Sequence, residues 1–182
     1  TNESARTRAL GALAPHLPSD LLPTAFAIVQ DITNESDRAA ALAALAPHLP
    51  SDLLPTAFAI VQDITNESDR AAALAALAPH LPSDLLRAAF AAVQDIEDGF
   101  VRARALGALA PHLPSDLLPT AFAIVQDITD ESARAVALAA LAPHLPSDLL
   151  PTAFAIVQDI AYEPARAVAL AALAPHLPSD LL

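Results

Sequence analysis

Histidine, serine and aspartate, the residue types of a hydrolase triad, occur together in one short stretch at His48, Ser51 and Asp52. In a working triad an oriented imidazole takes the serine proton, a carboxylate holds the imidazole, and nearby donors stabilise an oxyanion. The same three types recur at the same spacing in every copy of a repeated segment. Ser51 and Asp52 are also residues that commonly cap helices. We therefore interpret them as helix-start residues and predict that the chain is not an enzyme.

The histidines form a second regular set, spaced 32 residues apart: His16, His48, His80, His112, His144 and His176. A zinc site needs several ligand atoms within about 2.0–2.1 Å of one ion. Packed helices lie about 8–10 Å apart, so imidazoles from neighbouring copies do not easily share an ion. The chain has no cysteine to supply thiolate ligands. We predict no metal or cofactor, and expect each histidine to donate to free carbonyls at a helix end.

These residues recur because the whole chain is a tandem repeat. The segment TNESDRAAALAALAPHLPSDLLPTAFAIVQDI, residues 33–64, returns with few changes along the sequence. A fixed period of this length indicates stacked units that cannot bury their apolar faces alone. We predict a single repeat domain over 1–182. Its units are 1–32, 33–64, 65–96, 97–128, 129–160 and a partial 161–182.

Each unit has the pattern of two helices. Asn34 is a good cap for a first helix over 34–46, with Leu42 and Leu45 on its buried stripe and Pro47 at its end. Ser51 or Asp52 is expected to cap a second helix over 52–63, which is apolar around much of its circumference. The predicted fold class is all-α: a right-handed α-solenoid of antiparallel helix pairs with eleven helices.

This layout, with its small alanine positions, resembles the helical-hairpin repeat superfamilies of the HEAT, armadillo and tetratricopeptide kind. The resemblance covers the whole chain, although the aromatic-Leu-Gly signature of tetratricopeptide units is absent. It implies a scaffolding or binding role. The copies also look like the near-identical hairpin arrays of some large bacterial multidomain proteins, or like a consensus-designed array.

Charge excludes several classes of partner. The net charge is −12, there is no lysine, and the nine arginines are spread along the chain. Phosphate binding needs clustered cations, so we predict no nucleic-acid partner and no membrane association. No apolar run reaches the roughly 18 residues that would indicate a membrane span. The default expectation for localisation is the cytoplasm.

The repeat is irregular around its third and fourth units, where Pro-Thr becomes Arg87-Ala88, Ile becomes Ala92, and Phe100 replaces a serine. One interpretation is packing, with Phe100 filling space lost at Ala92. The other is a contact patch for a protein or peptide partner. The residues proposed for that contact are Arg87, Phe100, Arg102, Arg104 and the half-exposed Tyr162.

The last unit lacks its second helix, so the face with Leu170 and Leu173 is expected to lose a neighbour. Exposed apolar surface of this kind favours association with another copy of the chain. The predicted function is a non-catalytic repeat scaffold, structural or self-assembling, designed or excised from a larger array. The alternative is a natural protein- or peptide-binding solenoid that uses the irregular middle patch.

Overall fold

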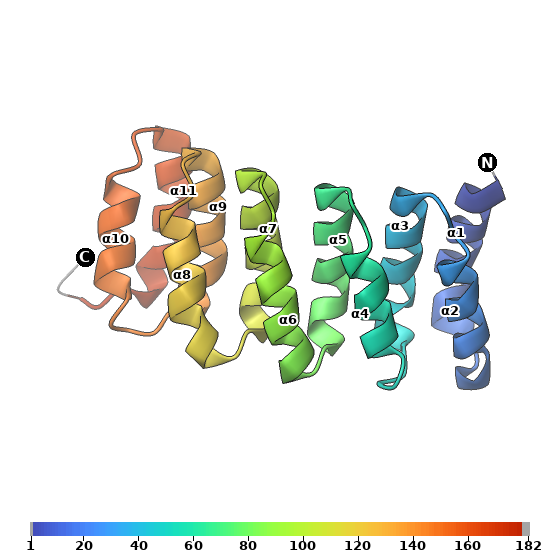
Figure 1. Cartoon of the computed structure of the whole chain (residues 1–182). Coiled ribbons are helices and arrows are strands. Elements are labelled where there is room, and N and C mark those ends of the chain that lie inside the picture. Colours follow the sequence, from blue (N-terminus) through green and yellow to red (C-terminus); the bar gives the residue numbers. More distant parts are fainter. Residues whose placement is uncertain (1, 180–182) are drawn as a thin grey trace. The chain divides into compact units, whose positions relative to one another are not determined.

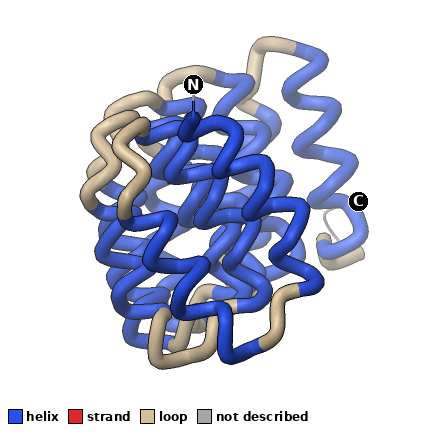
Figure 2. The backbone as a smooth tube through the Cα atoms, turned by 90° about the vertical axis from the view of Figure 1, so that its right-hand side faces the viewer, coloured by secondary structure: helices blue, strands red, loops and turns tan. Residues whose placement is uncertain are grey.

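The computed structural model describes residues 2–179, and within that range it has eleven α-helices joined by turns and loops, and no strand (Figures 1 and 2). The chain divides into two compact units, residues 1–85 and 86–182. Within each unit the helices pack in sequence order, as in an α-solenoid. The predicted all-α fold class is thus confirmed.

The first unit contains five α-helices and their connecting turns. They are α1 (Asn2–Leu13), α2 (Leu22–Gln30), α3 (Glu35–Leu45), α4 (Leu54–Gln62) and α5 (Glu67–Leu77). The odd-numbered helices pack against one another in series, α1 on α3 and α3 on α5. Each even-numbered helix packs on the odd-numbered helix that follows it, α2 on α3 and α4 on α5. We call the odd-numbered helices the A helices and the even-numbered ones the B helices.

The second unit repeats this arrangement. Its helices are α6 (Ser83–Gln94), which begins at the end of the first unit, α7 (Gly99–Leu109), α8 (Leu118–Gln126), α9 (Glu131–Leu141), α10 (Leu150–Gln158) and α11 (Glu163–Leu173). The A helices α7, α9 and α11 again pack in series, while α8 packs on α9 and α10 on α11. The predicted pairing of two helices per repeat is therefore present in both units.

The core of each unit consists of the same repeat positions. On the A helices the buried residues are leucine and alanine, as at Ala41, Leu42 and Leu45, each 0% exposed. On the B helices they include a valine and, except in α10, the phenylalanine one turn before it, such as Phe58. Small residues allow the A helices to approach closely: a Cβ added at Gly107 would lie only 2.9 Å from the Cβ of Ala140. No described residue of the core is polar or charged.

The N-termini of the A helices follow the predicted capping chemistry. The Oδ1 atom of Asn34 accepts from the backbone N–H of Asp37 at 2.9 Å, and Asn66, Asp98 and Asp130 cap their helices similarly. Such a cap satisfies a backbone donor that the helix itself leaves free. Tyr162 provides no side-chain cap, as expected, and Asn2 is the first residue of α1 instead of preceding it.

The predicted caps of the B helices are wrong. Neither Ser51 nor Asp52 caps α4, which begins at Leu54 without a side-chain cap. The reason is Pro55, which has no N–H and whose ring clashes with the carbonyl four residues earlier in a regular helix. In α6 the equivalent residue is Arg87, and that helix begins earlier, at Ser83. One proline therefore decides where a B helix begins.

Two further packing expectations are also wrong. Leu173 is only 2% exposed, so the last A helix does not present it to solvent, whereas Leu170 is half-buried and thus less covered than its fully buried equivalents Leu42 and Leu74. Phe100 is 49% exposed and does not fill a gap in the core. Ala92 leaves no such gap, because the isoleucines at its repeat position, including Ile60 and Ile124, are themselves only half-buried.

Candidate interaction surface

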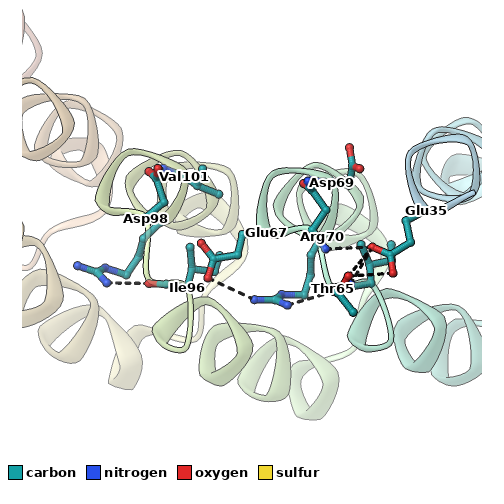
Figure 3. A network of polar contacts seen from close by, with 11 residues as sticks. Glu35, Thr65, Glu67, Asp69, Arg70, Ile96, Asp98 and Val101 are labelled. Carbon is teal, nitrogen blue, oxygen red and sulfur yellow. Dashed lines mark hydrogen bonds and ion pairs between the residues drawn. The ribbon is translucent and has the colours of Figure 1, made fainter.

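Acidic side chains at the start of three A helices each link their repeat to the next one. Glu35 accepts from the backbone N–H groups of Thr65 and Asn66, at 2.9 and 3.0 Å (Figure 3). Glu3 bonds residues 33 and 34 in the same way, and Glu131 bonds residues 161 and 162. These bonds lower the pKa of all three carboxyl groups, chiefly through backbone donors for Glu35 and Glu131 and through the Thr33 hydroxyl for Glu3. Their role is therefore structural.

These carboxylates predict an acid-sensitive repeat junction. A pKa held below its ordinary value of 4.5 stabilises the fold above that pH, and the contribution is lost as the pH falls through the folded-state pKa. The thermal midpoint should therefore fall as the pH drops below about 4.5. Replacing Glu3, Glu35 and Glu131 by glutamine should flatten that fall, as followed by circular dichroism against pH.

The matched control for this experiment is Glu163→Gln, because the Glu163 side chain is 85% exposed and pairs only within its own helix, with Arg166. This variant should keep the pH dependence of the unaltered chain. Equal pH profiles for the triple variant and the unaltered chain would contradict a role for the carboxylates in acid sensitivity.

An arginine on each A helix after the first bonds the loop that precedes that helix. The Nη1 atom of Arg102 donates to the carbonyl of Ile96 at 2.7 Å. Arg38, Arg70, Arg134 and Arg166 bond the equivalent isoleucine carbonyls at 2.9–3.1 Å. In the first unit Arg70 also lies 3.9 Å from Glu67 (Figure 3). Arg102 therefore belongs to a structural series and is not a feature of the irregular region alone.

Shallow hollows lie beside this arginine in the second unit. One, of about 380 Å³, is lined by Gln94, Arg102, Thr120, Ile124 and Asp127. The next copy repeats it at about 370 Å³ with the same five residue types. A hollow that recurs with the same lining is a consequence of the repeat, and its arginine already bonds a backbone carbonyl.

The His-Ser-Asp turn is not assembled into a triad. Ser51 and Asp52 are exposed, and His48 is half-buried in the short 3₁₀ turn Ala46–His48 that ends the A helix. The spacing correctly placed the histidine at this helix end. The backbone supplies a donor there: the carbonyl of Ala46 accepts from the backbone N–H of Leu49 at 3.4 Å.

Metal ligands do not converge either: across residues 2–179 no three side chains of His, Asp or Glu are placed to hold an ion. None of the helices in that range combines the length and apolarity that crossing a membrane requires.

The structure separates the residues that the sequence grouped as a contact patch. Arg87 of α6 forms a two-bond ion pair with Asp116, at 2.7 and 3.0 Å, which raises the pKa of Arg87 and lowers that of Asp116. Arg102 is turned toward the Ile96 carbonyl. Only Phe100 and Arg104, one helical turn apart, are exposed together on α7.

A different set of residues forms an exposed apolar surface on the A helices of the second unit. It comprises Phe100 of α7, Val136 of α9, Tyr162 directly before α11, and Val168 of α11, exposed by 49, 36, 55 and 53%. We call these four residues the outer apolar surface. A shallow hollow of about 200 Å³ connects Val136 with Tyr162 and Val168. Exposed apolar residues grouped on adjacent helices are typical of sites that bind other molecules.

The outer apolar surface exists only where the repeat departs from its common sequence. Phe100 occupies the position of Ser36, and Val136 and Val168 occupy the position of Ala40, which is exposed on α3. Sequence reasoning found Phe100 and Tyr162 and missed the two valines. The signal that would have found them was an alanine-to-valine change at a position that helical spacing places on the outer face.

The fold and this surface define the class of protein: an α-helical repeat array in which successive helices pack in sequence, with an exposed apolar surface on its second unit. Comparison with models of known families, with curated proteins and with solved structures finds no match.

Proposed function

We propose that this protein is a non-catalytic repeat scaffold that presents the outer apolar surface to a protein or peptide partner. The observation that carries the proposal is the position of the exposed large apolar side chains. Within the described residues 2–179, apart from those between Leu13 and Ile28, they lie on α7, α9 and α11 or, for Tyr162, directly before α11. A helical repeat has no folding need for an exposed phenylalanine, tyrosine or valine where its other copies have serine, asparagine or alanine.

The structural roles of the recurring polar residues support the proposal that the protein is non-catalytic. The recurring glutamate, arginine and asparagine side chains already bond the next repeat, a loop carbonyl or a helix N-terminus. Catalysis needs different groups converging on one reacting atom. The proposal of a scaffold agrees with the resemblance to HEAT, armadillo and tetratricopeptide arrays, and the near-identity of the copies also agrees with a consensus-designed array.

The chain provides its own control sequence for testing the proposal. The variant F100S/V136A/Y162N/V168A gives each position the residue found in other copies of the repeat. We expect it to fold at least as stably, because an asparagine at position 162 restores a helix cap worth about 1 kcal/mol. Peptides selected from a random display library on the unaltered chain should bind this variant at least tenfold more weakly, as measured by fluorescence anisotropy.

Two results would count against the proposal. One is that selection yields no peptide whose binding survives purification. The other is that the four-residue variant keeps the full affinity while its helicity and thermal midpoint equal those of the unaltered chain. A second control, Ala40→Glu, changes an exposed A-helix residue of the first unit and should leave peptide binding unchanged.

A further inference from the structure

In the first unit a serine–aspartate hydrogen bond joins neighbouring A helices. The Ser4 hydroxyl of α1 donates to Asp37 of α3 at 2.9 Å, and the Ser36 hydroxyl of α3 donates to Asp69 of α5. All four residues lie in the first turns of their helices. Polar side chains therefore bridge neighbouring A helices at this end of the first unit.

The second unit has lost this serine–aspartate pair. Phe100 of α7 takes the serine position, while Ala133 of α9 and Ala165 of α11 take the aspartate position. Ser132 of α9 is still a serine, but together with Ala165 it lines the hollow of about 200 Å³ that belongs to the outer apolar surface. An apolar hollow between α9 and α11 therefore lies where the first unit has a polar bridge.

This hollow has the size and lining of a site for one large apolar side chain. Val136 and Val168 line it from the two helices, and Tyr162 and Pro164 line it from the start of α11. A dry cavity of about 150 Å³ holds a benzene molecule, so a hollow of about 200 Å³ has room for a leucine or phenylalanine side chain. One such side chain can therefore anchor a partner here.

Phe100 and Arg104 offer further contacts on the other side of α9. Both are exposed on α7, which packs beside α9 as α11 does (Figure 1). Packed helices lie about 8–10 Å apart, so a partner that fills the hollow and reaches Phe100 spans at least one such spacing. In an α-helix, residues i and i+7 lie on one face about 10 Å apart. Two large apolar side chains at this spacing match the hollow and Phe100.

The backbone beneath this surface indicates that the partner is helical. Phe100, Val136 and Val168 belong to α-helices, whose backbone N–H and C=O groups bond within the helix. An extended segment gains affinity from backbone hydrogen bonds to a sheet edge, and residues 2–179 include no strand. A helix satisfies its own backbone groups and can lay an apolar face on apolar side chains.

Charges at the two ends of the surface favour one direction for such a helix. Arg104 is exposed at the α7 end, whereas Arg102, Arg134 and Arg166 of the same three helices each bond a loop carbonyl. At the α11 end the Glu163 side chain is 85% exposed. A helix carries partial positive charge at its N-terminus and partial negative charge at its C-terminus. The favoured direction therefore places the C-terminal end of the partner helix, with an acidic residue, at Arg104.

We propose that the outer apolar surface binds an amphipathic α-helix of a protein partner, lying across α11, α9 and α7. One large apolar side chain of that helix enters the hollow, a second one two turns later packs on Phe100, and an acidic residue follows it beside Arg104. This inference rests on the proposed scaffold function and specifies the partner that the same surface selects.

Designed peptides test the shape of the partner. The probe is an alanine-rich helical peptide of about 20 residues, with leucine at i and i+7 and glutamate at i+8. We expect the unaltered chain to bind it, as measured by fluorescence anisotropy. Moving the second leucine to i+5, off the apolar face, should weaken binding at least about tenfold, because one buried anchor is lost. A proline between the two leucines should do the same by breaking the helix.

Variants of the chain test the hollow. Ala165→Asp restores the aspartate of the first unit, so Ser132 can donate to a carboxylate and the hollow becomes polar. This variant should bind the probe at least about tenfold more weakly, because an apolar side chain no longer enters a dry site. Val168→Ala, at an exposed position where α3 has alanine, removes one wall of the hollow and should also weaken binding. It serves as the test if circular dichroism shows that Ala165→Asp has lost helicity.

Arg104 tests the direction of the helix. Arg104→Glu should weaken binding of the probe by up to about fivefold, the effect of one exposed ion pair. A probe with lysine in place of its glutamate should regain that loss on the variant. Arg8→Glu is the matched control, because Arg8 is exposed at the same repeat position in the first unit. It should leave the binding of both probes unchanged.

The inference is overturned by equal binding of the helical and proline-containing probes, by unchanged binding to the folded hollow variants, or by tighter binding of the lysine probe to the unaltered chain. Binding of no probe overturns it as well. That last result is distinct from a failure of the scaffold function, which still stands if peptides selected from the display library bind the outer apolar surface.

Discussion

Truncating Leu45 to alanine is expected to lower the free energy of unfolding by about 2–5 kcal/mol, the usual cost of a cavity in a packed core. Leu45 is 0% exposed and ends the A helix α3, where it packs inside the first unit. Little relaxation is available, because its neighbours on the buried face are alanines and leucines held by the helices around them. Urea denaturation followed by helicity would measure the loss.

Leu13→Ala is the matched control, since Leu13 has the same repeat position and the same type of neighbours along its helix but is 52% exposed. It should cost less than about 1 kcal/mol, as most surface substitutions do. The measurement should be made at low protein concentration, so that self-association does not add to the apparent stability. Equal losses at the two leucines would show that α1 is covered in solution or that α3 is not packed as described.

Replacing Arg102 by methionine is expected to destabilise the second unit by about 1–3 kcal/mol, because the Ile96 carbonyl loses its charged donor. Ile96 is 0% exposed, so solvent does not readily replace that donor. Methionine keeps much of the apolar stem of arginine, which limits the loss of packing. The loss should appear as a lower urea midpoint with an unchanged slope.

Arg104→Met is the control, two residues along the same helix. Arg104 is exposed, and its removal should change the free energy of unfolding by less than about 0.5 kcal/mol. The pair also tests the contact role first assigned to both arginines. If Arg102 acted mainly in partner binding, both variants would be equally stable and only peptide affinity would change.

The outer apolar surface sets the second unit apart from the common repeat. The outer surface depends on substitutions that set Phe100, Val136, Tyr162 and Val168 apart from the common repeat. A partner specific to this chain is therefore expected at the outer apolar surface.

The amino-acid sequence by itself determined the helices, the A-helix caps and the buried stripe. These features depend on local chemistry: asparagine or aspartate before a helix, proline after it, and leucines three residues apart, as at Leu42 and Leu45. Residues close in the sequence decide them, and the repeat presents each signal several times. That is why the expected first helix, 34–46, agrees with α3 to within one residue at each end.

Only the tertiary structure decided which side chains face solvent and which bond the next repeat. Glu35 meets Thr65 because neighbouring helices pack at a particular register, and Arg102 meets Ile96 because of how the loop turns into α7; a linear pattern contains neither. The same register leaves Phe100 exposed and Leu173 buried, the reverse of what their neighbours in the sequence suggested. Contacts between repeats depend on helix spacing, and here spacing follows from how the alanines of adjacent A helices fit together.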